Sequence, residues 1–412
     1  MSESRYRDYD EEQDREQVAR NRQRTGKKDK ARKRRIRRLW GILGVEVLIL
    51  VVLLAMNSVR YVDEKFDEID YTPLNEEDLS INEGLSPEIR EKYMTVALFG
   101  IDARDVNHDD GNRCDTIIIA SLNKDTNEVK IMSVLRDTYV EFENPGGNYD
   151  GCYTKVTHSY AFGGAKGAVA TLNQNLDLQI TDYATVNFLS LADIVDDLGG
   201  ITLDVTEDER NSVNFWLPET ATIAGRSYVE LYETGEAVTL DGLQAVTYCR
   251  IRNIGNGDID RAGRQREVIY SILSKAKSSD MATLNKILDD VLPEVSTSLS
   301  KKEILSLMTG VFEYQISDSN AFPFVYHVDP EGYYDDIAQM KLSIVAAADM
   351  QYNVELAHQF LYDAVIDETG SAVGTDSNEV YSPSLTVQGI SETITERTGL
   401  YRPEDPELRG GF

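Results

Sequence analysis

The sequence predicts an α/β fold, because two patterns alternate in the middle of the chain. Three short apolar runs rich in β-branched residues, "YMTVALFGID", "DTIIIASLN" and "VKIMSVLRD", each end in polar residues. Continuous runs of this kind are typical of strands buried on both faces of a sheet. Stretches with apolar residues at helical spacing follow them, as expected for helices that cover such a sheet.

The first two helical stretches are "GAKGAVATLNQNL" and "FLSLADIVDDLGG", and the second ends in a glycine pair suited to a left-handed cap. Asp241 has the side chain of an N-cap for the next stretch, "LDGLQAVTYCRIR". "DRAGRQREVIYSILSKAK" forms a further predicted helix. We expect amphipathic helical stretches to continue from there to about residue 366.

The N-terminal part of the 412-residue chain indicates a membrane anchor. Residues 1–38 carry 15 Lys and Arg against 8 Asp and Glu, although the whole chain has a net charge of -29. The apolar run of residues 39–56, interrupted only by Glu46, is just long enough to cross a bilayer. By the positive-inside rule, residues 1–38 form a cytoplasmic basic arm and the rest of the chain is extracellular. A cleaved signal peptide is the alternative, which the long basic arm disfavours.

Residues 57–412 divide by composition into three segments. Residues 57–92 are acidic and carry Pro73 and Pro87, which predicts an extracellular spacer. Residues 93–366 form the predicted single folded domain. Residues 367–412 are rich in Ser, Thr, Gly and Asp and are predicted to be disordered.

The cysteine count and the basic arm indicate the cellular compartment of the protein and the kind of partner it has. An odd number of cysteines (Cys114, Cys152 and Cys249) permits at most one disulfide, which favours a Gram-positive-type envelope that does not rely on disulfides. The basic arm indicates topology and contact with anionic lipid, so no nucleic-acid partner is expected.

An arginine cluster stands out in this acidic chain. The stretch "YCRIRNIGNGDIDRAGRQR", residues 248–266, holds five arginines. On a helical wheel, Asp258, Arg261 and Gln265 share the face of the apolar residues that follow, whereas Arg266 and Glu267 lie off it and are expected to be solvated. A buried Arg261 needs carboxylates or an anionic ligand beside it. A structural ion-pair network is the competing interpretation.

Charged pairs also lie at the ends of the predicted strands, where α/β sheets place ligand sites. Asp102 and Asp115 are close enough in sequence to meet across one loop and hold a hard cation such as Mg²⁺, although turn chemistry alone also explains such a pair. The pairs are Asp102 with Arg104, Arg113 with Asp115, and Arg136 with Asp137.

These motifs together identify a family. The series "LFGIDAR", "RCDT", "VLRDT", "KVTHSYAFGG", "VNFLSLADIVDDLGGI", "LDGLQAVTYCRIR" and "DIDRAGRQR", behind a basic arm and a single anchor, resembles the LytR-CpsA-Psr family over about residues 93–330. The resemblance implies a three-layer α/β/α sandwich with a central mixed β-sheet. It also implies a phosphotransferase that moves a glycopolymer, a teichoic acid or capsular polysaccharide, from a polyprenyl-pyrophosphate carrier onto peptidoglycan as a phosphodiester.

The resemblance also implies roles for individual residues. Asp102 and Asp115 are implied Mg²⁺ ligands. Asp258 is implied to orient the arginines or assist the acceptor hydroxyl, and it joins Arg136, Arg252 and Arg261 as an expected catalytic residue. The residues expected to bind the pyrophosphate are Arg104, Arg113, Arg136, Arg250, Arg252, Arg261, Arg264 and Gln265.

Phosphoryl transfer needs charge neutralisation and alignment more than a covalent nucleophile, so this set of residues suits it. Cys114 replaces the usual serine of the family motif, and is either an oxidisable thiol beside the metal or an inert buried one. His158 is either a participant or a structural hydrogen-bonding residue. We expect an apolar lipid pocket under the sheet, built from the helices after residue 165.

Two other functions remain compatible with the sequence. A non-catalytic receptor for lipid-linked wall polymer would use the arginines without the metal. A polyprenyl-pyrophosphate hydrolase would release phosphate without an acceptor.

Overall fold

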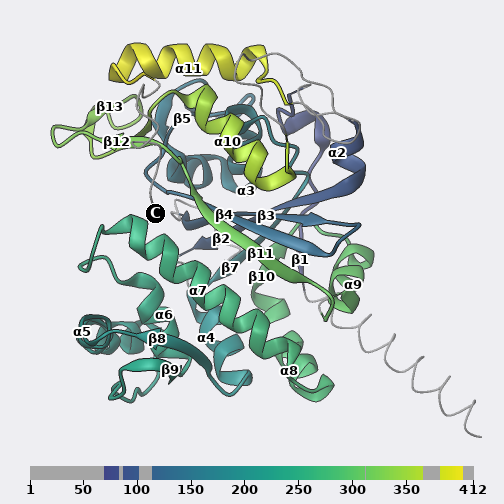
Figure 1. Ribbon diagram of the computed structural model, residues 1–412, viewed down its shortest axis with the longest axis vertical. Coiled ribbons are helices and arrows are strands. Elements are labelled where there is room, and N and C mark those ends of the chain that lie inside the picture. The colour runs from purple at the N-terminus through teal and green to yellow at the C-terminus, as the bar shows by residue number, and fades with distance from the viewer. Residues whose placement is uncertain (1–68, 83–86, 102–113, 311, 365–380, 402–412) are drawn as a thin grey trace, which may run out of the picture. The chain divides into compact units, whose positions relative to one another are not determined.

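The computed structural model describes residues 69–82, 87–101, 114–310, 312–364 and 381–401, all within the compact unit of residues 68–412 (Figure 1). The predicted basic arm (1–38) and membrane segment (39–56) lie outside these ranges. Within the described part of the chain, no helix is both long and apolar enough to cross a bilayer.

A seven-stranded mixed sheet forms the centre of the unit, in the order β1-β10-β7-β2-β3-β4-β11. The strands are β1 (Asp70–Tyr71), β2 (Tyr93–Ile101), β3 (Cys114–Asn123), β4 (Glu128–Val134), β7 (Asp182–Asn187), β10 (Val295–Thr297) and β11 (Gln315–Phe322). β2 pairs antiparallel with β3 and parallel with β7, and β3 pairs antiparallel with β4. The three strands predicted from apolar runs are therefore confirmed as β2, β3 and β4, in the middle of the sheet, where both faces are covered.

Helices cover both faces of this sheet (Figure 1). On one face lie α3 (Val156–Leu176), α10 (Met350–Tyr362) and α11 (Leu385–Thr398). On the other lie α4 (Phe188–Asp197), α6 (Gly242–Arg250), α7 (Asp258–Lys277) and α8 (Met281–Val291). The expected mixed central sheet with flanking helices is confirmed. The described part of the chain also contains α2 (Pro87–Lys92) and α9 (Lys301–Gly310).

A second, smaller core lies under the sheet, where α4, α6 and α7 pack against α5 (Glu207–Ala224) and a ribbon of β8 (Ile201–Val205) and β9 (Gly235–Leu240). Asp241 caps α6 as predicted, because its side chain accepts a hydrogen bond from the Gln244 amide at 2.9 Å. Val195, Ala245 and Val268 are fully buried in this core. These contacts fix the positions of α6 and α7, the helices that carry Arg250 and Arg261.

The predicted spacer over residues 57–92 is wrong for residues 70–82, and also for 87–92, where α2 places Ile89 in the main core. β1 pairs in parallel with β10, and the Leu79 side chain is fully buried in the main core. The Leu79 carbonyl also accepts a hydrogen bond from Asn173 Nδ2 at 3.0 Å. One buried leucine hardly changes the average composition of an acidic segment. The composition therefore did not predict that this segment packs against the core.

The predicted helical run to residue 366 is wrong for residues 295–297, which form β10, and between residues 315 and 347. This segment forms β11, at the edge of the main sheet in parallel with β4, and four short strands. Only one edge of β11 is paired in the sheet, and most of its first six residues are exposed, so it lacks the apolar signature of a central strand. The four short strands are β12 (Tyr326–Val328), β13 (Tyr333–Asp335), β14 (Met340–Leu342) and β15 (Val345–Ala347).

The predicted disorder of residues 367–412 is wrong for residues 381–401. This segment carries α11, which begins at the N-cap Ser384 and buries Val387, Ile390 and Ile394 in the main core. The spacing of these three residues by three and four places them on one helical face. Because the residues around these three are mostly polar, the composition of the segment predicted disorder.

Candidate active site

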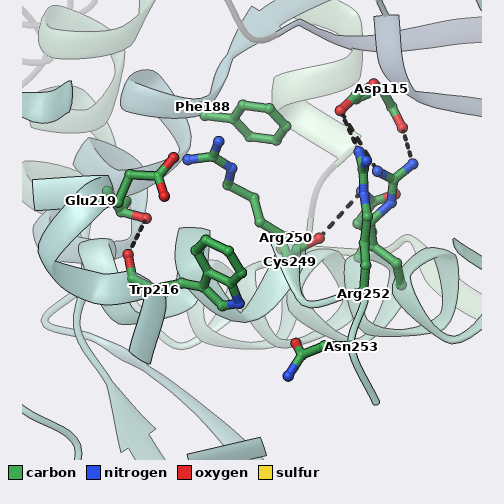
Figure 2. A pocket seen from close by; sticks show the side chains of 11 residues that line it. Asp115, Phe188, Trp216, Glu219, Cys249, Arg250, Arg252 and Asn253 are labelled. Carbon is green, nitrogen blue, oxygen red and sulfur yellow. Dashed lines mark hydrogen bonds and ion pairs between the residues drawn. The ribbon is translucent and has the colours of Figure 1, made fainter. Parts of the chain in front are cut away.

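Asp115, the second residue of β3, is surrounded by arginines from three other parts of the chain. Figure 2 shows it beside Arg252. Arg136, which follows β4, places Nη1 2.7 Å from Asp115 Oδ1. Arg252, which follows α6, places Nη2 2.7 Å from Asp115 Oδ2. Arg261 of α7 donates from Nη2 to the Asp115 carbonyl at 2.9 Å, and its Nη1 lies 3.6 Å from Oδ2.

The charges of this cluster are strongly coupled. Burial opposes ionisation of Asp115, but the attraction of Arg136 and Arg261 outweighs it and lowers the pKa of the carboxyl group. Burial lowers the pKa of Arg261 to about 10, helped by the nearby positive charge of Arg252 and opposed by Asp258. Arg261 is only 4% exposed, so the predicted burial of this residue is confirmed.

Asp258, the first residue of α7, joins the same arginines from the other side. Its carboxylate lies 3.1 Å from Arg261 Nη1, 3.3 Å from Arg252 Nε and 3.6 Å from Arg136 Nη2. A carboxylate in the first turn of a helix is also favoured by the helix dipole. Asp258 is therefore placed to orient all three guanidinium groups.

A cavity of about 320 Å³ opens beside this cluster. Gln265 and Arg250 lie on its wall; Gln265 Nε2 donates to the Cys249 carbonyl at 3.5 Å, and the Arg250 guanidinium stacks 5.8 Å from the Phe188 ring centre. The described lining residues are Asp115, Phe188, Trp216, Glu219, Thr220, Cys249, Arg250, Arg252, Asn253, Arg261 and Gln265.

The cavity suits an anion. Three of its described lining residues are arginines, against two carboxylates, so positive charge is in excess. Arg261 Nε is buried and has no hydrogen-bond partner among the described residues. A buried guanidinium donor without a partner is costly unless a ligand supplies an acceptor, and guanidinium groups match phosphate oxygens in geometry.

Not every predicted site residue reaches this cavity. Arg264 is buried elsewhere, where its Nε donates to Glu209 at 2.9 Å and its Nη1 to the Ile251 carbonyl at 3.2 Å. Arg264 does not line the cavity, and neither do Arg136 and Asp258, which contact the lining residues Asp115, Arg252 and Arg261 from behind. Asp102, Arg104 and Arg113 lie outside the described residues, so their predicted roles stay predictions.

Among described residues no cluster of three or more metal-ligating side chains occurs, and Asp115 is the one described member of the predicted Mg²⁺ pair.

The burial of individual side chains tests the predicted exposure of Arg266 and Glu267 and the two interpretations of Cys114. Arg266 was expected to be solvated but is partly buried, and burial lowers its pKa. Glu267 is exposed as expected. The Cys114 thiol is fully buried and donates to the Thr116 carbonyl at 2.8 Å, and burial raises its pKa, which favours the interpretation of an inert thiol.

His158 stands apart from the cavity. Its Nδ1 is hydrogen-bonded to Thr154 Oγ1 at 2.6 Å and lies 3.8 Å from Asp335 Oδ2. It is absent from the cavity lining. This geometry matches the interpretation of His158 as a structural hydrogen-bonding residue.

Phe188, Trp216, Glu219 and Asn253 also line the cavity, although no motif in the sequence predicts it. Two of them, Trp216 and Glu219, lie on α5, a helix that the apolar spacing did not reveal. One signal was present: Thr206 and Glu209 form a capping box, in which the Thr206 side chain bonds the Glu209 amide and the Glu209 side chain bonds back. That signal predicts where α5 begins, although nothing in it predicts which residues face the cavity.

Comparison with known proteins agrees with the motifs and the fold. A polyisoprenyl-teichoic acid–peptidoglycan teichoic acid transferase TagU from Enterococcus faecalis is 29% identical over 267 residues, covering 63% of this chain and 78% of the relative. A protein of the same name from Bacillus subtilis is 32% identical over 237 residues, covering 57% of this chain and 67% of the relative.

The fold also has a solved counterpart. A crystal structure of a protein from Streptococcus agalactiae covers 78% of this chain and 100% of its own, with a TM-score of 0.55 and 23% identity. The model of the LytR_cpsA_psr family matches residues 59–323, which is more than half of the chain. With its sheet, its motifs and its arginine cluster in agreement, the chain belongs to the LytR-CpsA-Psr family.

Proposed function

We propose that this protein is a membrane-anchored phosphotransferase that moves a glycopolymer from a polyprenyl-pyrophosphate carrier onto peptidoglycan as a phosphodiester. The observation that carries the proposal is the set of arginines that converges on Asp115 beside an anion-compatible cavity. The names of the relatives, as polyisoprenyl-teichoic acid–peptidoglycan teichoic acid transferases, support the same reaction class. A teichoic acid or capsular polysaccharide is the polymer proposed.

In this reaction an acceptor hydroxyl of peptidoglycan attacks the phosphorus that bears the saccharide. A new P–O bond forms to the acceptor, and the bond from that phosphorus to the bridging oxygen breaks. Polyprenyl monophosphate leaves, and the hydroxyl proton passes to solvent. Arg252, Arg261 and Arg250 would bind the phosphate oxygens and neutralise the charge that grows on the leaving group.

Asp258 and Arg136 have positioning roles in this scheme. The Asp258 carboxylate contacts the side chains of Arg136, Arg252 and Arg261, so it fixes guanidinium groups that would otherwise repel one another. Arg136 holds Oδ1 of the Asp115 carboxylate, whereas Arg252 holds Oδ2. A preorganised set of donors avoids the free-energy cost of reorientation during the reaction.

We further propose Mg²⁺ as the cofactor, held by Asp115 together with Asp102. Asp115 fits this role because it lines the cavity, and hard cations prefer carboxylate oxygen ligands. When bound, the cation would supply charge neutralisation at the phosphate oxygens. The arginines that pair with Asp115 in the structure would then be available to the pyrophosphate.

The proposed location is the outer face of the cytoplasmic membrane in a Gram-positive-type envelope, with the N-terminus in the cytoplasm. The basic residues 1–38 and the apolar residues 39–56 support this topology. An extracellular domain tethered in this way would reach both a lipid-linked donor and peptidoglycan.

The test is a transfer assay with the full chain in detergent, a polyprenyl-pyrophosphoryl saccharide and a peptidoglycan oligomer. We expect Mg²⁺-dependent product from the wild type and about a hundredfold lower turnover from Arg252→Ala, the typical loss for one transition-state donor. Arg226→Ala is the matched control, because Arg226 is a partly exposed arginine paired with Asp193 away from the cavity. Equal turnover of Arg252→Ala and the wild type would refute the proposed role of the cluster.

A further inference from the structure

The cavity has a second end whose chemistry differs from that of the arginine cluster. Figure 2 shows Trp216 and Glu219 on one side of Arg250, and Asp115 with Arg252 on the other. Trp216 and Glu219 both lie on α5 and are three residues apart, so they share one helical face. Neither belongs to the motifs that define the site around Asp115.

Trp216 presents an aromatic surface that the fold does not cover. Its side chain lines the cavity and is 40% exposed, and its neighbour Phe215 is 72% exposed. The two rings meet edge to face, with centroids 5.0 Å apart and an interplanar angle of 89°. This contact orients the indole. A large aromatic ring left open in a cavity, within a strongly charged chain, indicates a ligand that stacks on it.

Polar groups surround this aromatic surface. Glu219 supplies carboxylate acceptors to the cavity, and Asn253 supplies an amide. The orientation of that amide is fixed, because Ser212 Oγ donates to Asn253 Oδ1 at 2.7 Å. An aromatic ring bordered by hydrogen-bonding groups is complementary to a pyranose ring, which has an apolar C–H face and hydroxyl groups around its rim. A lipid chain would instead place apolar surface against the Glu219 carboxylate and the Asn253 amide nitrogen, whose hydrogen-bonding capacity it cannot use.

The size of the cavity limits what can bind there. A volume of about 320 Å³ is at the small end of the range for small-ligand sites, about 300–1,000 Å³. Because the arginines occupy the other end, the space beside Trp216 accommodates a group directly next to the phosphates and not a length of polymer.

We propose that Trp216, Glu219 and Asn253 form a saccharide-binding subsite for the sugar ring adjacent to the transferred phosphate. This inference rests on the proposed function, since it takes the arginine end as the pyrophosphate site. The sugar belongs either to the lipid-linked donor or to the peptidoglycan acceptor, and both present the same pyranose chemistry.

The test uses the only two tryptophans of the chain, Trp40 and Trp216. In the full chain with Trp40→Phe, the tryptophan fluorescence comes from Trp216 alone. The probes are farnesyl pyrophosphate, the same lipid pyrophosphate bearing an N-acetylhexosamine, and a peptidoglycan disaccharide. We expect a sugar-bearing probe to change the Trp216 emission and farnesyl pyrophosphate to leave it nearly unchanged.

Affinities measured by calorimetry on variants give the second readout. Trp216→Ala should weaken binding of a sugar-bearing probe about tenfold, while farnesyl pyrophosphate binds as it does to the wild type. Glu219→Gln, which preserves size, should weaken the same probe and provides a second variant that keeps the aromatic surface. Tyr232→Ala is the matched control, because Tyr232 is 73% exposed but does not line the cavity.

The outcomes separate the two possible sources of the sugar and the two proposals. A loss confined to the glycosylated lipid assigns the subsite to the donor, and a loss confined to the disaccharide assigns it to the acceptor. If farnesyl pyrophosphate binds the wild type but both variants bind every sugar-bearing probe normally, the subsite is refuted and the proposed function stands. If the wild type binds no lipid pyrophosphate at all, both are refuted.

Discussion

The imidazole of His358 lies fully buried in α10, and its protonation should destabilise the fold. Its Nε2 lies 2.9 Å from the Leu176 carbonyl, so the nitrogen must donate its hydrogen there. Its Nδ1 is buried without a hydrogen-bond partner among the described residues. The ring also stacks on Tyr381, with centroids 3.6 Å apart. A second N–H would have no acceptor in this position.

Burial accordingly lowers the pKa of His358 from 6.5 to about 4, although the Leu176 carbonyl and Asp177 oppose the shift. The unfolded chain therefore binds this proton more readily than the folded chain does. The stabilisation is fully present above about pH 6.5 and is lost as the pH falls to about 4. For these two pKa values, linkage gives a loss of about 2 kcal/mol between pH 7 and pH 5.

Urea unfolding of the full chain at pH 7 and pH 5, followed by near-ultraviolet circular dichroism, measures this loss. His358→Asn should be less stable at pH 7, but its stability should fall by about 2 kcal/mol less than that of the wild type between the two pH values. His327→Asn is the matched control, because His327 is a histidine exposed on β12. An equal fall in His358→Asn and the wild type would refute the reasoning.

Two further predictions concern stability. Arg264→Ala removes the charged partner of the Glu209 carboxylate in a site where both side chains are under 15% exposed, and should destabilise the fold by about 3 kcal/mol. Arg210→Ala, which removes an exposed pair with Glu207 and a hydrogen bond to Asn211, should cost under about 1 kcal/mol. Equal melting temperatures for these two variants would contradict the structural role of Arg264. Ile394→Ala in α11 should cost about 3 kcal/mol and Leu385→Ala, which is 85% exposed, almost nothing; a thermal melt in which neither lowers the midpoint would show that α11 is not part of the core.

The sequence predicted the parts of the fold that local patterns determine. β2, β3 and β4 were found because their apolar residues are contiguous, and α6 because Asp241 provides a recognisable cap. The burial of Arg261 followed from its place on the apolar face of α7. In each case the physical signal lies within a few residues of the element itself.

Other parts were missed because their stability comes from distant partners. Leu79 and Ile394 each lie in polar segments and become core residues only when the sheet and α3 are assembled. Arg264 was assigned to the pyrophosphate because its motif is shared with Arg261, whereas its partner Glu209 lies on a helix that the apolar spacing did not predict. Trp216 enters the cavity only through the packing of α5 against α6. These contacts join residues that are distant in sequence. They produce no local periodicity from which they could be predicted.

The central claim is that the arginine cavity transfers a saccharide phosphate to peptidoglycan. The most direct measurement is a mass-spectrometric analysis of the products formed by the full chain from a polyprenyl-pyrophosphoryl saccharide and a peptidoglycan oligomer. The mechanism predicts polyprenyl monophosphate and a phosphodiester-linked saccharide–peptidoglycan product in equal amounts, both lost in Arg252→Ala and retained in Arg226→Ala. Release of polyprenyl monophosphate together with free saccharide phosphate, at a rate independent of the acceptor, would show hydrolysis and contradict the claim.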